Sequence, residues 1–242
     1  MCIRDRPWLS ALLIHGVLIA LAQRLPLLTR AGWIHAGALG TILLGSLGWQ
    51  GWLAVVLYLV LGSAVTKLGF RDKQRRGLAE ARGGSRGPEN VWGSAATGAA
   101  LALLIGAGVE PRSVLLVGFA ASFAAKLADT FGSEIGKRWG RTTILITSFR
   151  RVPPGTEGAI SLEGTLASAL GSLLMSVLML ALQLIPSWPL TGLVMLIGLV
   201  ATLAESLFGA LVQDRYDWMS NELVNALQTS LAAVLAITAM RI

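Results

Sequence analysis

Charged residues are scarce in this sequence, and the shortage excludes an ordinary soluble domain. Asp, Glu, Lys and Arg make up 14% of the 242 residues, whereas 54% are hydrophobic. Soluble domains usually carry about a quarter charged residues. Several windows, including 91–109, 160–185 and 189–212, approach or exceed the ~20 apolar residues that cross a bilayer. We therefore expect an all-α fold, a polytopic transmembrane helical bundle with about seven or eight spans.

Cysteine is also scarce, because Cys2 is the single one. One cysteine cannot form an internal disulfide, and a metal site built from several cysteines is excluded. The P-loop pattern GxxxxGK[ST] is missing as well, which excludes a P-loop enzyme. The opening stretch MCIRDRP resembles translated adaptor sequence, so we expect residues 1–7 to be an artefactual leader.

The charge that is present lies mainly in two basic loops. Lys and Arg are concentrated in 67–86 and 137–151, between apolar runs, and the net charge is +7. Membrane proteins gather Lys and Arg in their cytoplasmic loops. We therefore expect both loops in the cytosol and no nucleic acid among the partners.

Alternation across the membrane then gives the organisation of the chain. We expect three N-terminal spans in 8–66, a basic cytosolic loop at 67–89 and a catalytic membrane core at 90–242, with a second cytosolic loop at 137–158. The spans are expected at 8–28, 32–48, 51–66, 90–109, 113–136, 159–185, 189–212 and 221–240. The sequence leaves the oligomeric state open.

The stretch KLADTFGSEIGK (126–137) places ionisable residues at the end of an apolar run. At roughly 100° per residue, a helix gathers its polar side chains on one face and sets Gly132 and Gly136 along the edge of that face. These side chains belong to Lys126, Asp129, Thr130, Ser133, Glu134 and Lys137. One interpretation is a structural helix in which Lys126 neutralises Asp129. The other is a functional site, because charges within a membrane span must be compensated.

Two later spans carry polar stripes that would reach the same membrane depth. Glu205 and Gln213 share a face of one span, and Asn221, Asn225 and Gln228 share a face of the next. Each stripe alone is typical of hydrogen bonding between helices. Together with the carboxylates of the charged stretch, they predict a hard-oxygen site suited to Mg²⁺.

The candidate residues divide by role. The candidate metal ligands are Asp129, Glu134 and Glu205. The candidate catalytic residues are Asp129, Glu134 and Lys137. The candidate substrate-pocket residues are Lys126, Thr130, Ser133 and Gln213.

The segment RRVPPGTEGAISLEGTLAS (150–168) has features of a phosphate-binding element. Two arginines precede a Pro-Pro-Gly turn, and a helix is expected directly afterwards. Helix N-termini and turns with exposed N–H groups bind phosphate, and Asn90 and Ser220 are expected to cap two more helices on this face. A plain loop entering a helix is the alternative. The candidate phosphate-binding residues are Lys67, Asn90, Arg150, Arg151, Pro154, Gly155, Thr156, Gly158, Ser161, Asn221 and Asn225.

These segments resemble the integral membrane family of plant and cyanobacterial phytyl-phosphate kinases and their uncharacterised relatives. The similar motifs are KLADTFGSEIGK, RRVPPGTEGAISLEGTLAS, AESLFGALVQ (204–213) and SNELVNALQTSLAA (220–233), with the basic loop at 67–96. The resemblance implies a CTP-dependent phosphotransferase that converts phytyl, or another prenyl, monophosphate into the diphosphate with Mg²⁺, as in tocopherol biosynthesis. It also implies a bacterial inner or thylakoid membrane, with the active site facing the cytosol.

Three other functions stay open at this stage. A CTP-dependent kinase of another lipid and a cytidylyltransferase would use the same metal and nucleotide chemistry. An ion-coupled membrane transporter would use Lys126, Asp129 and Glu134 as an ion path.

Overall fold

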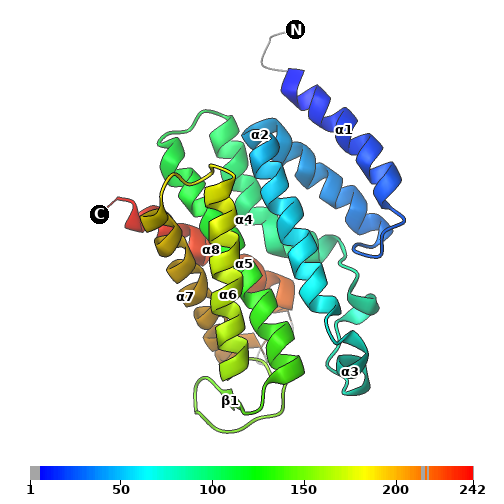
Figure 1. The fold of residues 1–242 in the computed structure, drawn as a ribbon, viewed down its shortest axis with the longest axis vertical. Coiled ribbons are helices and arrows are strands. Elements are labelled where there is room, and N and C mark those ends of the chain that lie inside the picture. The colour runs from blue at the N-terminus through cyan, green and yellow to red at the C-terminus, as the bar shows by residue number, and fades with distance from the viewer. Residues whose placement is uncertain (1–5, 214–215, 217, 242) are drawn as a thin grey trace.

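The computed structural model describes residues 6–213, 216 and 218–241. Most of the leader expected at residues 1–7 lies outside this part of the chain. Residues 1–5, which include Cys2, are not described. The helices are α1 (Arg6–Ala22), α2 (Arg30–Lys67), α3 (Phe70–Arg75), α4 (Pro88–Gly106), α5 (Arg112–Trp139), α6 (Leu162–Ala181), α7 (Trp188–Val212) and α8 (Asn221–Ala239), with a 3-10 turn at Ala81–Gly84. The expected all-α bundle is confirmed (Figure 1).

The α2 segment doubles back on itself at Gly48. This residue has φ +72° and ψ −167° in the middle of an otherwise helical stretch. A positive φ is costly for residues other than glycine, so Gly48 permits a turn that would strain most residues. Figure 1 shows the two arms of α2 running in opposite directions. The tight connection expected between residues 48 and 51 is therefore present as the turn of a helical hairpin.

Five helices are long and apolar enough to cross a membrane within the described residues: α2, α5, α6, α7 and α8. The expected number of seven or eight spans is approximate, because it counted both arms of α2 and also included α1 and α4. Helices α1 and α4 are apolar and have 17 and 19 residues.

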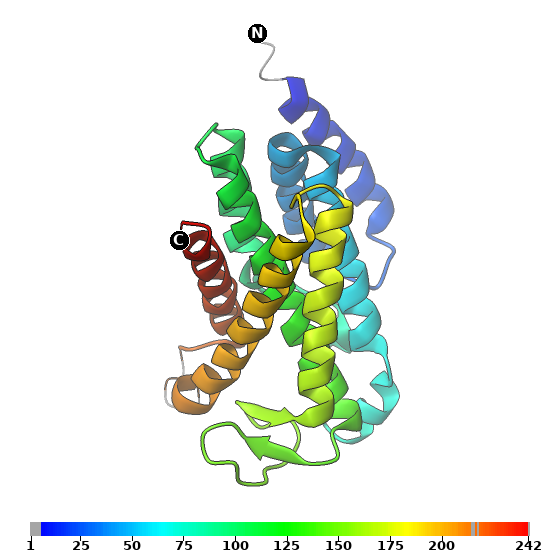
Figure 2. The same ribbon diagram turned by 60° about the vertical axis from the view of Figure 1, so that its left-hand side comes forward.

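Helix α5 is the centre of the bundle. In the most apolar 18-residue stretch of α5, 78% of the residues are buried. The corresponding share is 33–39% in the other four helices that could cross a membrane. Its buried face is rich in alanine, including Ala120, Ala121, Ala124 and Ala125, so neighbouring helices can approach closely. Helices α2, α4, α6, α7 and α8 all pack against it (Figures 1 and 2).

The glycine edge of α5 packs against α6, as the sequence predicts. A Cβ placed on Gly164 of α6 would lie 2.9 Å from the carbonyl oxygen of Gly132 and 3.4 Å from the Cα of Gly136. Such short separations leave no room for a side chain. The contact therefore fixes the polar face of α5 relative to the first turns of α6.

The segment between α5 and α6 forms a small β-hairpin that the sequence did not predict. Strand β1 (Thr143–Leu145) pairs antiparallel with β2 (Ala159–Ser161), and Thr143 stands opposite Ser161. Helix α6 therefore begins at Leu162, three residues later than expected, and it ends at Ala181 rather than at residue 185. Figure 2 shows this hairpin at one end of the bundle.

Candidate functional site

A polar pocket of about 480 Å³ lies at the end of the bundle where the hairpin sits. Helices α4, α6 and α8 begin at this pocket, and α2, α5 and α7 end near it. The 3-10 turn and the loop of the hairpin complete its walls. The structure thus gathers segments that are far apart in the sequence around one cavity.

Helix α5 supplies the most densely charged wall of the pocket. Its predicted polar face lines the cavity with Lys126, Asp129, Thr130, Ser133, Glu134 and Lys137. Lys126 is buried, forms an ion pair with Asp129 and donates a hydrogen bond to Asn225 Oδ1 at 2.8 Å. Both interpretations of this stretch are therefore compatible with the geometry, since the ion pair exists and also faces the pocket.

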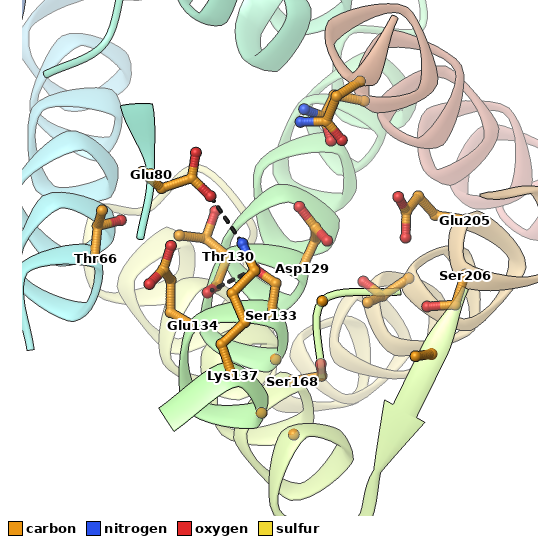
Figure 3. Close-up of a pocket in the computed structure, with 18 of the residues that line it drawn as sticks. Thr66, Glu80, Asp129, Thr130, Ser133, Glu134, Lys137, Ser168, Glu205 and Ser206 are labelled. Carbon is orange, nitrogen blue, oxygen red and sulfur yellow. Dashed lines mark hydrogen bonds and ion pairs between the residues drawn. The ribbon is translucent and has the colours of Figure 1, made fainter. Parts of the chain in front are cut away.

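Asp129 and Glu205 face each other across the pocket from α5 and α7 (Figure 3). They are near enough to interact electrostatically. Among the described residues, no three side chains of the His, Cys, Asp and Glu types gather closely enough to hold a metal ion by themselves. A metal ion between Asp129 and Glu205 would therefore need further ligands, such as substrate phosphates or water.

The charge balance of the pocket is compatible with Mg²⁺. Of the residues that the structure describes, six with carboxylate side chains and four with basic side chains line it. A triphosphate entering such a cavity would meet excess negative charge unless divalent cations came with it. Magnesium is commonly held by one or two protein carboxylates together with substrate phosphates, and Asp129 and Glu205 fit that pattern.

Glu134 is paired with a basic residue that the sequence did not single out. It forms an ion pair with Lys73 of α3, and the two side chains are 3% and 0% exposed. Lys73 Nζ also donates to the backbone oxygen of Thr66 at 2.8 Å. One oxygen of Glu134 is thus engaged in holding α3 to α5. Asp129 is also ion-paired, but its side chain is 17% exposed against 3% for Glu134, so Asp129 and Glu205 are the more accessible candidate metal ligands.

Lys137 reaches across the pocket mouth to Glu80, with 2.9 Å between Nζ and Oε1 (Figure 3). Burial is the largest single influence on the pKa of Glu80 and raises it, but the nearby charges of Lys137, Lys126 and Arg86 and the hydrogen bond from Lys137 together lower it by more. This pKa therefore lies below its usual value. Glu80 therefore stays ionised, and the loop before the 3-10 turn is tied to α5.

Two arginines of the basic loop line the pocket beside α4. Arg82 pairs with Glu89 and donates to Asn90 Oδ1 at 2.9 Å. Arg86 donates to the hydroxyl of Tyr58 at 2.9 Å. Neither arginine is among the candidate residues predicted from the sequence, since nothing in the Gly-rich loop distinguishes them from their basic neighbours.

Asn90 lines the pocket but does not cap α4 as expected. The N-cap residue is Gly87, and the side chain of Asn90, three residues on, accepts a hydrogen bond from Gly87 N at 2.9 Å. Its amide nitrogen donates to Glu222 of α8 at 3.0 Å. Asn90 therefore joins the first turns of two helices at the pocket. The expected cap at Ser220 is present, because its hydroxyl accepts from Leu223 N.

The hairpin loop brings backbone groups to the opposite wall. Pro154, Gly155, Thr156 and Gly158 line the pocket. Gly158 has φ +71°, and a Cβ there would lie 2.5 Å from the backbone oxygen of Ser206 in α7. Only glycine fits both the conformation and the close approach. Ser161 then caps α6 by accepting from Gly164 N at 3.1 Å.

Four candidate residues are not among those that line the pocket. Lys67 donates instead to the backbone oxygen of Pro26, on the exposed surface. Arg150 and Arg151 are exposed on the hairpin, where the backbone of Arg150 pairs with Leu145. Gln213 follows the last turn of α7, beyond the pocket wall. Arg150 and Arg151 lie between the two strands that the sequence did not predict, and the hairpin places them outside the cavity lining.

Taken together, these elements define a polytopic helical membrane protein with a polar, charge-lined pocket at one end of its bundle. Residues 13–233 match the family described as "Integral membrane protein DUF92", and the chain belongs to this family. The expected resemblance to plant and cyanobacterial proteins is confirmed by the relatives below.

Three relatives illustrate the range of the family. An uncharacterised membrane protein of Synechocystis is 47% identical over 96% of this chain and 90% of its own. The Arabidopsis thaliana protein named "Protein VTE6, chloroplastic" is 40% identical over 95% of this chain and 71% of its own. An uncharacterised membrane protein of Methanocaldococcus jannaschii is 29% identical over 94% of this chain and 92% of its own. No solved structure matches the chain.

Proposed function

We propose that this protein is a membrane-bound phosphotransferase that uses CTP to convert phytyl phosphate, or another prenyl monophosphate, into the diphosphate. The observation that carries the proposal is the pocket itself. Within the described residues, it combines two facing carboxylates, four basic side chains and the first turns of three helices. Such a set suits polyphosphate and metal at a membrane surface. The similarity to a chloroplastic plant protein supports a plant-type prenyl substrate.

The reaction needs little covalent chemistry from the protein. A terminal oxygen of the prenyl phosphate attacks the γ-phosphorus of CTP, the bond to the β-phosphate oxygen breaks, and CDP leaves. Positioning and charge neutralisation supply most of the catalysis in such transfers. When bound, Mg²⁺ would neutralise phosphate charge and align the phosphates.

The residues of the chain divide this work. Asp129 and Glu205 would hold the metal. Lys126 neutralises Asp129 and is fixed by Asn225, so it orients that carboxylate toward the pocket. Arg82 and the backbone N–H groups around Gly155 and Gly158 would bind the triphosphate.

The position of the charges disfavours an ion-coupled transporter. Lys126 and Asp129 lie near the middle of α5, but the other charged residues of the walls lie nearer to helix ends or in the loops beside them. Transporters place coupling charges near the middle of the membrane, between broken helices. The basic loops around the pocket support a cytosolic orientation of the site.

A product analysis tests the proposal. Purified protein is incubated with phytyl phosphate, CTP and Mg²⁺, and the lipid and nucleotide products are resolved by mass spectrometry. CDP with phytyl diphosphate is the expected pair. Pyrophosphate with a CDP-lipid would instead indicate a cytidylyltransferase, and absence of turnover with any prenyl acceptor would reject the proposal.

A further inference from the structure

A second cavity of about 140 Å³ lies between α1, the two arms of α2 and the first turns of α4. Its walls are almost entirely hydrophobic, with Ile19, Trp33, Leu43, Val56, Leu59 and Val91 among them. His15 lies in this wall, but both of its ring nitrogens are engaged. Nδ1 donates to the oxygen of Ala11 at 2.7 Å, and Nε2 accepts from Trp52 at 2.8 Å. The wall therefore presents little hydrogen-bonding capacity to an occupant.

This apolar cavity adjoins the polar pocket. Arg86, Asn90 and Ser94 line both. Arg86 lies over the ring of Tyr58 at 5.5 Å and donates to its hydroxyl, so the two side chains mark the boundary. Within the described part of the chain, Arg86 forms no ion pair with a carboxylate. Its charge is thus available to an anionic group at the junction.

The apolar cavity extends from this junction toward the other end of the bundle. On the first arm of α2, the lining residues run from Trp33 to Leu43. Trp33 is the nearer of these two to the junction, because Thr29, one turn before it, donates from its backbone N to the backbone oxygen of Arg86 at 3.0 Å. Ten residues of helix correspond to roughly 15 Å. The shape is therefore a slot along the helices with one charged end.

We propose that this slot binds the isoprenoid chain of the acceptor lipid, with the lipid phosphate at Arg86 and Asn90. This inference rests on the proposed function and assigns the place of its lipid substrate. A molecule with one anionic head and one apolar tail matches a slot with a single guanidinium at its polar end. A nucleotide would leave its base and ribose without hydrogen-bond partners against these walls. The arrangement puts the acceptor phosphate beside the polar pocket, where the donor would lie.

Photolabelling tests the assignment without requiring turnover. The probe is a prenyl monophosphate with a diazirine at the far end of its chain, applied to the full chain in detergent and mapped by peptide mass spectrometry. We expect labels on α1, the arms of α2 and the start of α4, competed by unlabelled prenyl monophosphate and about tenfold less well by the free prenyl alcohol. Labels spread over the outward faces of α6 to α8 would overturn the assignment.

A pair of matched variants sharpens the test. Val56→Phe fills the slot and should reduce its labelling by about tenfold. Val234→Phe makes the same change on α8, where the side chain is 59% exposed, and should leave the labelling unchanged. Leu59→Phe serves as a second filled-slot variant if Val56→Phe does not fold. Undiminished slot labelling in both folded variants would also overturn the assignment.

The failure of this inference can be separated from failure of the proposed function. Labelling in the slot without product from CTP supports the lipid site and rejects the phosphotransferase. Phytyl diphosphate formation with labels elsewhere supports the phosphotransferase and rejects the slot.

Discussion

Lys73 and Glu134 form a buried ion pair that joins α3 to the C-terminal part of α5. The pair links the basic loop to the helix that carries the charged wall of the pocket. Breaking a buried pair by removing one partner strands the other charge in a poorly solvated place, which typically costs about 3–5 kcal/mol. The pair therefore has a structural role, independent of any role of Glu134 in the reaction.

The first prediction concerns stability. Lys73→Met should lower the free energy of unfolding by about 3–5 kcal/mol, because it leaves Glu134 buried without its partner. The double variant Lys73→Met/Glu134→Met should recover most of this loss, since both charges are then removed. Denaturant unfolding in detergent measures all three proteins. A double variant that is less stable than Lys73→Met would contradict the coupling.

The second prediction concerns the facing carboxylates. Asp129→Asn and Glu205→Gln should each raise the Mg²⁺ concentration for half-maximal turnover by at least about tenfold, or abolish turnover, while the protein stays folded. Glu110→Gln provides the control, because Glu110 is exposed and does not line the pocket. Initial rates over a Mg²⁺ titration give the answer. An unchanged Mg²⁺ response in both pocket variants would remove these residues from the metal site.

The third prediction separates the arginines. Arg82→Ala should raise the KM for CTP by about tenfold, which corresponds to about 1.4 kcal/mol for one charge-assisted contact. Arg151→Ala should change it by less than about twofold, because an exposed arginine outside the pocket makes at most a weak, screened contribution. CTP titrations at low and high salt compare the two. A larger effect of Arg151→Ala would place the nucleotide on the outer side of the hairpin.

The fourth prediction concerns the orientation in the membrane. In a Cys2→Ser background, single cysteines at Ser85 and Ser148 should react with a membrane-impermeant thiol reagent from the cytosolic side. A cysteine at Ser187, which precedes α7 at the other end of the bundle, should react from the opposite side. Labelling in intact spheroplasts and in inverted vesicles distinguishes the two sides. Reaction of positions 85 and 148 from different sides would show that the pocket does not face one compartment.

Much of the fold could be predicted from the sequence because membrane helices depend on local composition. The polar face of α5 follows from helical period alone, and its glycine edge at Gly132 and Gly136 predicts close packing against another helix. The turn at Gly48 was also visible, because glycines on both sides of Trp49 and Gln50 interrupt the apolar run. These features depend on nearby residues.

The missed features depend on contacts between distant segments. The strands Thr143–Leu145 and Ala159–Ser161 are three residues each, too short to give a pattern of their own. A sequence reading without these strands places Arg150 and Arg151 beside the site, whereas both are exposed on the hairpin. The partner of Glu134 is 61 residues away in the chain, and no local rule singles out Lys73 from the other basic residues of its loop. Three-dimensional packing decides such pairings.

The most direct test of the central claim follows the phosphorus atoms of the donor. CTP labelled at the γ-phosphate and CTP labelled at the α-phosphate are supplied in parallel with phytyl phosphate and Mg²⁺ to the wild-type protein and to Asp129→Asn. The account predicts label in the lipid diphosphate from γ-labelled CTP only, and none above background in the variant. Lipid labelled from α-labelled CTP, or equal labelling by wild type and Asp129→Asn, would contradict it.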